Sequence, residues 1–362
     1  MLFYTCILQM QYLKENNVSI KKAMRNFIAP VIIVLLILLL PGRMPGMGYG
    51  NGILSSDTTG VMRVKKSNEF NIAIDSSLGY NDKYIRAGLI FDVNTNTVVW
   101  QKQMKTQVPI ASLTKMMVAL LTIEDIKSGA ICWNTPVTVT KEASLVMDSR
   151  VFLKEGTIVT VEDLFEAAMI RSGNDAAFLL AQWGCGSEEF FVQRMNEKAL
   201  ELGMKNTHYW NSNGLPGIQK GNKDNYSTAE DLLILAKEAL KHPEYIEICS
   251  REVETIHNGY SQLEYENRNK LVKYYKNEID GLKTGYTKNA KTCIVATSKR
   301  CDHRVISIVL GVESSTTRND IAVNMFNNYY KSIGLGVLGQ ELEPAVVKQQ
   351  ECIEESEENG SN

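Results

Sequence analysis

The chain has 362 residues, of which 44% are hydrophobic, 22% charged and 8% aromatic. This composition is typical of a globular protein and excludes collagen, a coiled coil or disorder as a description of the whole chain. Because 39 basic residues stand against 41 acidic ones, the net charge is −2. We expect no nucleic-acid partner, since phosphate binding requires clustered positive charge.

The N-terminal region carries an apolar run of fourteen residues, 27–40, preceded by four basic residues and closely followed only by Arg43. This pattern predicts a signal peptide or an N-terminal signal anchor over residues 1–42. The run is short for a bilayer span, and no A-x-A cleavage site follows it, so both interpretations stay open. In either case the rest of the chain is expected outside the cytoplasm, secreted or held at the cytoplasmic membrane through an uncleaved N-terminus.

The two segments that flank the expected folded region are polar. Residues 43–68 are rich in Gly, Ser, Thr and Asn, which predicts a linker. Residues 346–362 contain five glutamates among Gly, Ser and Asn, which predicts an acidic disordered tail. One catalytic domain is therefore expected over residues 69–345.

The first expected elements are a hairpin and a buried helix. Residues 84–93 are typical of a strand, 94–97 of a turn, and 98–100 of a returning strand. A helix is expected over 112–126, and it should be buried because its residues 116–121 are apolar all round.

Helices fill the middle of the chain. Thr160 is expected to cap a helix that breaks at residues 172–174, after which Asn174 or Asp175 caps a second helix, 176–183.

Two further helices are expected after these. Ser187 should cap a helix that stops at Gly203, and the pair Ser227 and Glu230 indicates a capping box that opens a helix through Leu240.

The last elements are strands at 279–286, 293–297 and 305–312, followed by a helix at about 318–332. Strands at both ends with helices between them predict an α+β fold, in which one antiparallel sheet is flanked by helices and packs on an all-helical block. The helix that starts at Ser112 would lie between the sheet and the helical block.

Three short motifs contain residues that can take part in catalysis or substrate binding. Ser112 and Lys115 stand three residues apart, so a helix would place the hydroxyl beside the amine. A desolvated lysine near another cation has a lowered pKa and can accept the serine proton. Ser172-Gly173-Asn174 at a helix break can present a hydroxyl and an amide to a cleft. Lys283-Thr284-Gly285 at a strand end suits an extended anionic substrate.

Each motif alone is common, but the three in this order resemble the penicillin-binding protein and serine β-lactamase superfamily, with its S-x-x-K, S-x-N and K-T-G motifs. Within it, residues 70–335 look most like the low-molecular-mass D-alanyl-D-alanine carboxypeptidases, serine peptidases that trim peptidoglycan stem peptides. Supporting stretches are 110–117, 202–207, 226–232 and 280–287.

The resemblance implies roles for the catalytic residues. Ser112 would attack the D-Ala-D-Ala carbonyl and form an acyl-enzyme, with Lys115 as general base. Ser172 would relay a proton to the leaving amine. Lys283 would supply positive potential and help lower the pKa of Lys115. Neither a metal nor a cofactor is implied, and β-lactams would be covalent inhibitors.

It also implies substrate-binding residues. Asn174 would bind a substrate amide, Thr284 the terminal carboxylate beside Gly285, and Arg318 would lie near that carboxylate. The backbone N–H groups of Ser112 and Tyr286 would form the oxyanion hole.

Two other functions stay open. A β-lactamase would use the same scaffold, but it needs a glutamate that activates water for deacylation, and no candidate for that role stands out between Ser172 and Lys283. A degenerate wall-binding sensor that binds penicillin would be expected to lose a motif, whereas all three are intact here. A Ser/His/Asp hydrolase is disfavoured because no G-x-S-x-G elbow occurs.

The cysteines and histidines suggest no further site. The seven cysteines are odd in number and sparse, so mostly buried free thiols are expected, with a Cys293–Cys301 pair left open. The four histidines lie far apart and no C-x-x-C is present, so we expect no metal site.

Overall fold

The computed structural model describes residues 70–73, 82–216 and 223–340. The predicted signal or anchor (1–42), linker (43–68) and acidic tail (346–362) lie outside the described residues. Among the described helices, none is long and apolar enough to cross a bilayer.

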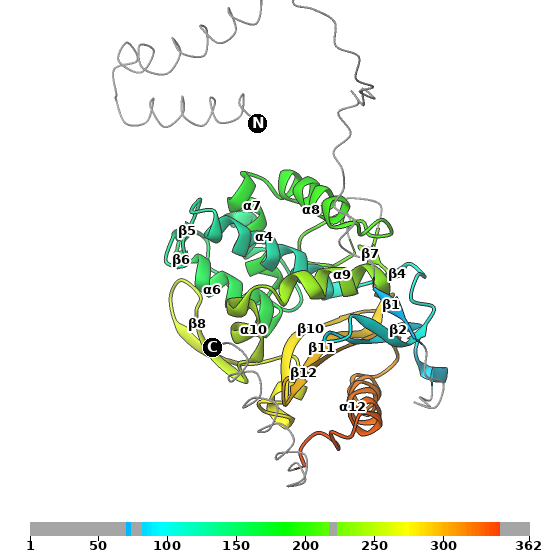
Figure 1. Cartoon of the computed structure of the whole chain (residues 1–362). Helices are drawn as coiled ribbons and strands as arrows, with labels where there is room; N and C mark the ends of the chain where they lie inside the picture. Colours follow the sequence, from blue (N-terminus) through cyan, green and yellow to red (C-terminus); the bar gives the residue numbers. More distant parts are fainter. Residues whose placement is uncertain (1–69, 74–81, 217–222, 341–362) are drawn as a thin grey trace, which may run out of the picture. The chain divides into compact units, whose positions relative to one another are not determined.

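A six-stranded sheet forms the centre of the fold (Figure 1). Its strands, in spatial order, are β1 (Asn71–Ile72), β3 (Thr97–Lys102), β2 (Ala87–Asp92), β12 (His303–Val312), β11 (Lys291–Arg300) and β10 (Ile279–Thr287). The neighbours from β3 to β10 pair antiparallel, as predicted, but β1 pairs with β3 in parallel. A two-residue strand is too short to show a period of two in the sequence, which is why it was not predicted.

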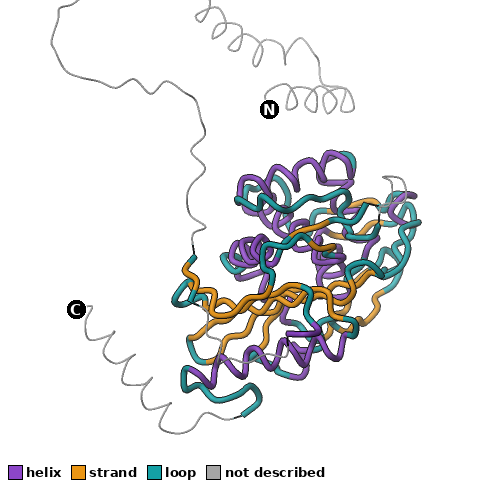
Figure 2. The backbone as a smooth tube through the Cα atoms, turned by 90° about the vertical axis from the view of Figure 1, so that its right-hand side faces the viewer, coloured by secondary structure: helices purple, strands orange, loops and turns teal. Residues whose placement is uncertain are grey.

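Both faces of the sheet are covered. Successive side chains of a strand point to opposite faces, and in this sheet the side chains on each face are largely apolar. In β12, Ile306, Ile308 and Leu310 belong to the core shared with the helical block. Val305 and Val309 belong to a second core with Phe326 of α12 (Ser315–Ser332). Figures 1 and 2 show the resulting order of layers, with the helical block, the sheet and then α12. The α+β prediction is therefore confirmed.

The helical block contains most of the helices. They are α4 (Lys115–Lys127), α5 (Lys141–Ser144), α6 (Val161–Glu166), α7 (Asn174–Cys185), α8 (Glu188–Leu202), α9 (Ala229–Ala239) and α10 (Pro243–Ser250). A π-helical turn, η5 (Ala167–Arg171), extends α6. A 3-10 turn, η4 (Ala111–Thr114), precedes α4, so the helix predicted from Ser112 begins with a tighter turn.

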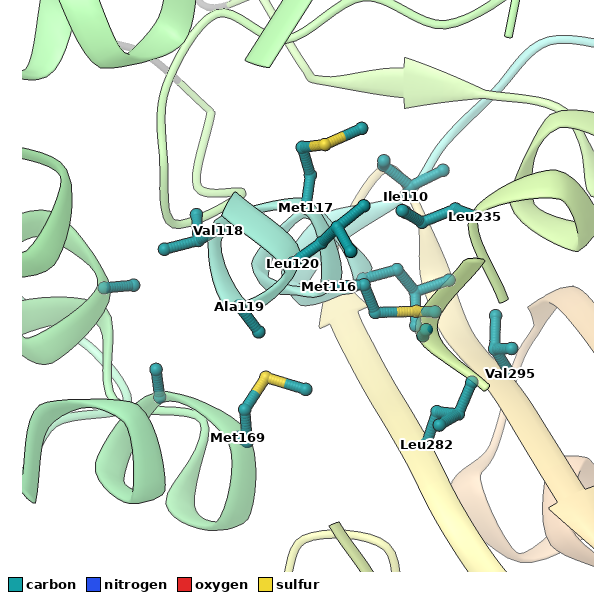
Figure 3. Packing of buried hydrophobic residues seen from close by; sticks show 14 of the residues in the cluster. Ile110, Met116, Met117, Val118, Ala119, Leu120, Met169, Leu235, Leu282 and Val295 are labelled. Carbon is teal, nitrogen blue, oxygen red and sulfur yellow. The ribbon is translucent and has the colours of Figure 1, made fainter. Parts of the chain in front are cut away.

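Helix α4 is buried through its first nine residues, as the apolar sequence predicted. Figure 3 shows its side chains pointing in all directions, with Met169 of η5 near one side and Leu282 and Val295 of the sheet near another. The helix therefore lies between the sheet and the rest of the helical block, which confirms its predicted place. The turn η4 and this helix therefore hold Ser112 and Lys115 at the boundary between the two layers.

Several predicted helix ends are confirmed. The Thr160 hydroxyl accepts a hydrogen bond from the Asp163 N–H, and the Asp163 carboxylate accepts one from the Thr160 N–H, which completes a capping box. Ser187 caps α8, and Gly203 ends it in the left-handed conformation.

Two predicted caps are wrong. Helix α9 is capped by Thr228, because Ser227 lies in β7 (Tyr226–Ser227) and its hydroxyl bonds that of Thr207. The N-cap of α7 is Gly173 rather than Asn174 or Asp175, whose side chains bond more distant parts of the chain.

Some elements were not predicted at all. They are the helices α5, α10 and the short α11 (Leu271–Tyr274), the strands β4 (Val108–Pro109) and β7, which pair with each other, and the hairpins β5–β6 (Pro136–Thr138, Ile158–Thr160) and β8–β9 (Val253–His257, Gln262–Glu266). The five described cysteines are all unpaired, so Cys293 and Cys301 do not form a disulfide. Only Cys249 and Cys293 of the five are buried, fewer than predicted.

The capping box at Thr160 begins the helix that ends at Ser172, so its loss should weaken this part of the fold. We expect Thr160→Ala to lower the free energy of unfolding by about 1 kcal/mol, because the Asp163 N–H loses its acceptor. Thr160→Ser should retain most of the stability. Urea denaturation measures the difference, with Thr138→Ala as a control at an exposed strand position. Equal stability of Thr160→Ala and the parent protein would contradict the prediction.

Candidate active site

The turn that carries Ser112 joins strand β4 to the buried helix α4. Ala111 has a φ of 47°, which turns the chain sharply into η4, and Lys115 is the first residue of α4. The Lys115 Nζ lies 2.9 Å from the Ser112 Oγ. The predicted pairing of hydroxyl and amine is therefore present.

Three oxygen atoms surround the Lys115 amine. Besides the Ser112 hydroxyl, Nζ lies 2.8 Å from Asn174 Oδ1 and 2.6 Å from the backbone carbonyl oxygen of Asn213. The Asn174 Nδ2 donates to the Met147 carbonyl, which fixes Oδ1 toward the lysine. The sequence had singled out Asn174 but not Asn213, because any residue type can offer a backbone carbonyl.

Burial governs the protonation of Lys115. The side chain is fully buried, and no carboxylate bonds its amine among the contacts of the described residues. Desolvation lowers the pKa of Lys115 well below its ordinary value, and the positive charge of Lys283 lowers it further. The negative charge of Asp175 opposes both effects. A neutral amine beside a serine hydroxyl is a competent general base.

Ser172 lies at the break between η5 and α7, as predicted. It has a φ of 65°, in the left-handed region that non-glycine residues rarely occupy, and it is buried. The next helix is tied to a facing loop, because the Asn174 N–H donates to the Ser149 carbonyl and the Asp175 carboxylate accepts from the Val151 N–H. In the part of the chain that the structure describes, the Ser172 hydroxyl forms no hydrogen bond, so its proton is not committed elsewhere.

Strand β10 brings the third motif to the same place. Lys283 is buried, and its amine donates to the Thr284 carbonyl at 3.3 Å. Burial lowers the pKa of Lys283 to about 7, with contributions from the charges of Arg268 and Arg318, while Cys249 acts in the opposite direction. Each buried amine thus has a lowered pKa, and the charge of Lys283 contributes to the lowering at Lys115.

Gly285 allows β10 to lie directly against the nucleophile turn. A Cβ at this position would lie 3.0 Å from the Ile110 carbonyl oxygen and 3.1 Å from the Ser112 nitrogen. A larger residue would therefore push the strand away from Ser112. Tyr286, the next residue, is 65% exposed, whereas Thr284 is buried.

Arg318 reaches the sheet from α12. Its guanidinium is buried and donates to the Cys293 carbonyl at 3.3 Å and to the Asn319 side chain at 2.7 Å. Cys293 pairs with Gly285 in the β10–β11 ladder, so Arg318 lies next to the third motif. Burial lowers the pKa of Arg318 to about 10, and the residue remains a cation at neutral pH.

The structure therefore brings together all three motifs, which lie up to 173 residues apart in the sequence. A hydroxyl, an amine with a strongly lowered pKa and the cationic Arg318 lie where the sheet meets the helical block. This set of groups is suited to acyl transfer through a serine ester, with binding of a substrate that carries a negative charge.

Comparison with known proteins supports this interpretation. The profile of the D-alanyl-D-alanine carboxypeptidase family matches residues 81–314. The D-alanyl-D-alanine carboxypeptidase DacF of Bacillus subtilis is 34% identical over 243 residues, which cover 67% of this chain and 61% of the relative. DacC of Escherichia coli is 35% identical over 243 residues, which cover 64% and 58%. The match thus spans about three fifths of the length of these curated relatives.

A solved structure shares the fold. Penicillin-binding protein D2 of Listeria monocytogenes, in an ampicillin-bound form, has a TM-score of 0.61 at 28% sequence identity. The match covers 68% of this chain and 97% of that one. Since the family profile also matches well over half of the chain, the protein belongs to the D-alanyl-D-alanine carboxypeptidase family.

Proposed function

We propose that the protein is a serine-type D-Ala-D-Ala carboxypeptidase that removes the terminal D-Ala from peptidoglycan stem pentapeptides. The observation that supports this most directly is the Lys115 amine, which is buried, has a lowered pKa and lies 2.9 Å from the Ser112 hydroxyl. Such a pair activates a serine without a histidine. Neither a metal nor a cofactor is needed for this chemistry.

In the proposed reaction, the Ser112 Oγ attacks the carbonyl carbon of the D-Ala-D-Ala bond while Lys115 takes the hydroxyl proton. The C–N bond then breaks, and Ser172 relays a proton to the departing amine of D-Ala. Water hydrolyses the resulting serine ester and restores the Ser112 hydroxyl. The hydroxyl of Ser172 lies at the break before α7 and forms no hydrogen bond with the described residues, so it is available for this relay.

Substrate binding is assigned to the groups around β10. Thr284 would hold the terminal carboxylate with the buried cation Arg318 nearby, and Lys283 would supply positive potential when protonated. The Asn174 amide would bind a substrate amide. The backbone N–H groups of Ser112 and Tyr286 would form the oxyanion hole, an assignment supported by the close approach of Gly285 to the Ser112 nitrogen.

The proposal also concerns the place of action and the inhibitors. Residues 69–345 would form the catalytic domain, acting outside the cytoplasmic membrane, where peptidoglycan lies. The N-terminal segment would hold it there if uncleaved. Penicillins would acylate Ser112, as the ampicillin-bound form of the Listeria relative suggests.

The first test measures D-Ala released from a peptide ending in Lys-D-Ala-D-Ala by the purified protein. We expect release by the parent protein and none by Ser112→Ala, because the mutant lacks the nucleophile. Circular dichroism of both proteins serves as the control for folding.

Other outcomes would point elsewhere. Penicillin labelling that requires Ser112 without D-Ala release would favour a wall sensor or another substrate. Rapid turnover of the penicillin ester would favour a β-lactamase. Neither release nor labelling would reject the enzyme proposal.

The backbone of Ser172 allows its hydroxyl to be tested separately from the fold. Ser172→Gly and Ser172→Ala both remove the hydroxyl, but glycine adopts a φ of 65° without strain. We expect both variants to lose at least about 100-fold in D-Ala release, from the usual contribution of acid–base catalysis. Ser172→Gly should unfold at the same temperature as Ser172→Ala or higher. Near-normal release by Ser172→Gly would refute the proton relay.

The charge of Lys283 should set the pH at which Lys115 becomes a base. Since Lys283 lowers the pKa of Lys115, Lys283→Met should raise that pKa. The acidic limb of the pH profile for acylation should therefore move to higher pH, with the rate of fluorescent-penicillin labelling as the measurement. Lys288→Met, at an exposed position, serves as the control. A limb at unchanged pH in Lys283→Met would contradict the coupling of the two amines.

A further inference from the structure

The carbonyl that Asn213 presents to Lys115 belongs to a loop, residues 211–215, that packs against the nucleophile turn. Gly214 in this loop has a φ of 87°, and a Cβ there would lie 2.0 Å from the Ala111 carbonyl oxygen. The two backbones thus touch with no side chain between them. The missing side chain of Gly214 allows the loop to pack closely on the turn, and this packing sets the position of the Asn213 carbonyl.

The side chain of Asn211 fixes the shape of this loop. Its Oδ1 accepts a hydrogen bond from the Gly214 N–H at 2.7 Å, and its Nδ2 donates to the Leu215 carbonyl at 2.7 Å. The amide is buried, so water cannot replace these bonds without opening the loop. Both bonds close a turn of the chain that contains Asn213.

The side chain of Asn225 joins the loop to the nucleophile turn. Its Nδ2 donates to the Thr114 hydroxyl at 2.9 Å and to the Asn211 carbonyl at 3.0 Å. Its Oδ1 accepts from the Trp210 N–H at 2.6 Å, and its backbone carbonyl accepts from the Ile110 N–H at 3.1 Å. A single buried asparagine therefore contacts both segments that surround the amine of Lys115.

The geometry of a neutral amine shows what this arrangement achieves. A neutral lysine has two N–H bonds and one lone pair, but Lys115 has three oxygen neighbours. The Asn213 carbonyl and the Asn174 Oδ1 can only accept hydrogen bonds. Only the Ser112 hydroxyl can donate one. If both acceptors stay in place, the lone pair of Lys115 must face the Ser112 proton.

We propose that Asn211 and Asn225 are positioning residues for proton transfer, which hold the Asn213 carbonyl against Lys115 so that the lysine lone pair faces Ser112. This inference rests on the proposed function, in which Lys115 is the base for acylation of Ser112. The asparagines do not touch the reacting atoms. They act through the Asn213 carbonyl, which accepts a hydrogen bond from one of the two N–H groups of the neutral lysine.

The test compares the rate and pH profile of fluorescent-penicillin acylation for Asn211→Leu and Asn211→Ser. Leucine has a similar volume but cannot accept the hydrogen bond from the Gly214 N–H. A serine hydroxyl is uncharged and can accept that bond. We expect Asn211→Leu to slow acylation by about 100-fold, the usual cost of misplacing a catalytic group by about 1 Å. Its acidic limb should move to higher pH, because water that enters the loosened loop raises the pKa of Lys115. Asn211→Ser should recover most of the rate and the original limb.

A matched control separates positioning from general stability. Asn258 is also buried and donates to the Val151 carbonyl at 3.1 Å, but none of its hydrogen bonds within the described residues goes to the 211–215 loop or the nucleophile turn. Asn258→Leu should lower the unfolding temperature and leave the pH limb in place. Asn225→Leu should behave as Asn211→Leu does, which covers the case in which that variant fails to fold.

Two results would overturn the inference. One is acylation of Asn211→Leu or Asn225→Leu at the parental rate and with the parental pH limb. The other is an equal loss of rate in Asn211→Leu and Asn211→Ser with an unmoved limb, which is the signature of a merely structural role. Failure of the parent protein to be labelled at Ser112 would instead reject the proposed function.

Discussion

The desolvated amine of Lys115 is the interaction on which the site depends. Within the described residues no carboxylate bonds this amine, so its charged form is costly to bury, and that cost lowers its pKa. Three oxygens lie within hydrogen-bonding distance of the amine: the Ser112 hydroxyl, the Asn174 amide oxygen and the Asn213 carbonyl oxygen. Each comes from a different segment, so the site forms only when the helical block closes around α4.

The sheet contributes the second half of the site. Gly285 allows β10 to contact the nucleophile turn, and that contact brings the Lys283 charge close to Lys115. Arg318 adds a cation, which is held near Gly285 because its guanidinium donates to the carbonyl of Cys293, the residue paired with Gly285. Positive charge thus lies beside an amine that must stay neutral, and the same charge can attract a carboxylate. One electrostatic arrangement therefore serves both the base and the binding of an anionic substrate.

Sequence reasoning succeeded where local rules decide the structure. The apolar run of α4, the hydroxyl caps at Thr160 and Ser187, and the strands of high β-propensity all follow from neighbours along the chain. It failed where a side chain has a distant partner. Ser227 bonds Thr207 instead of capping α9, and Asp175 bonds the Val151 N–H instead of capping α7. The hydrogen-bond network of Asn211 and Asn225 was missed for the same reason, because no local sequence pattern indicates that an asparagine will be buried against distant partners.

The sequence by itself determined the order of the main helices and strands, the α+β class and the three motifs with their spacing, because periodicity and residue type are local properties. It could not determine the environment of Lys115. Burial, the charge of Lys283 and the Asn213 carbonyl arise only when segments separated by 98 to 168 residues meet. A pKa depends on solvent exclusion and on charges in space, so only the tertiary structure decides that this lysine can act as a base.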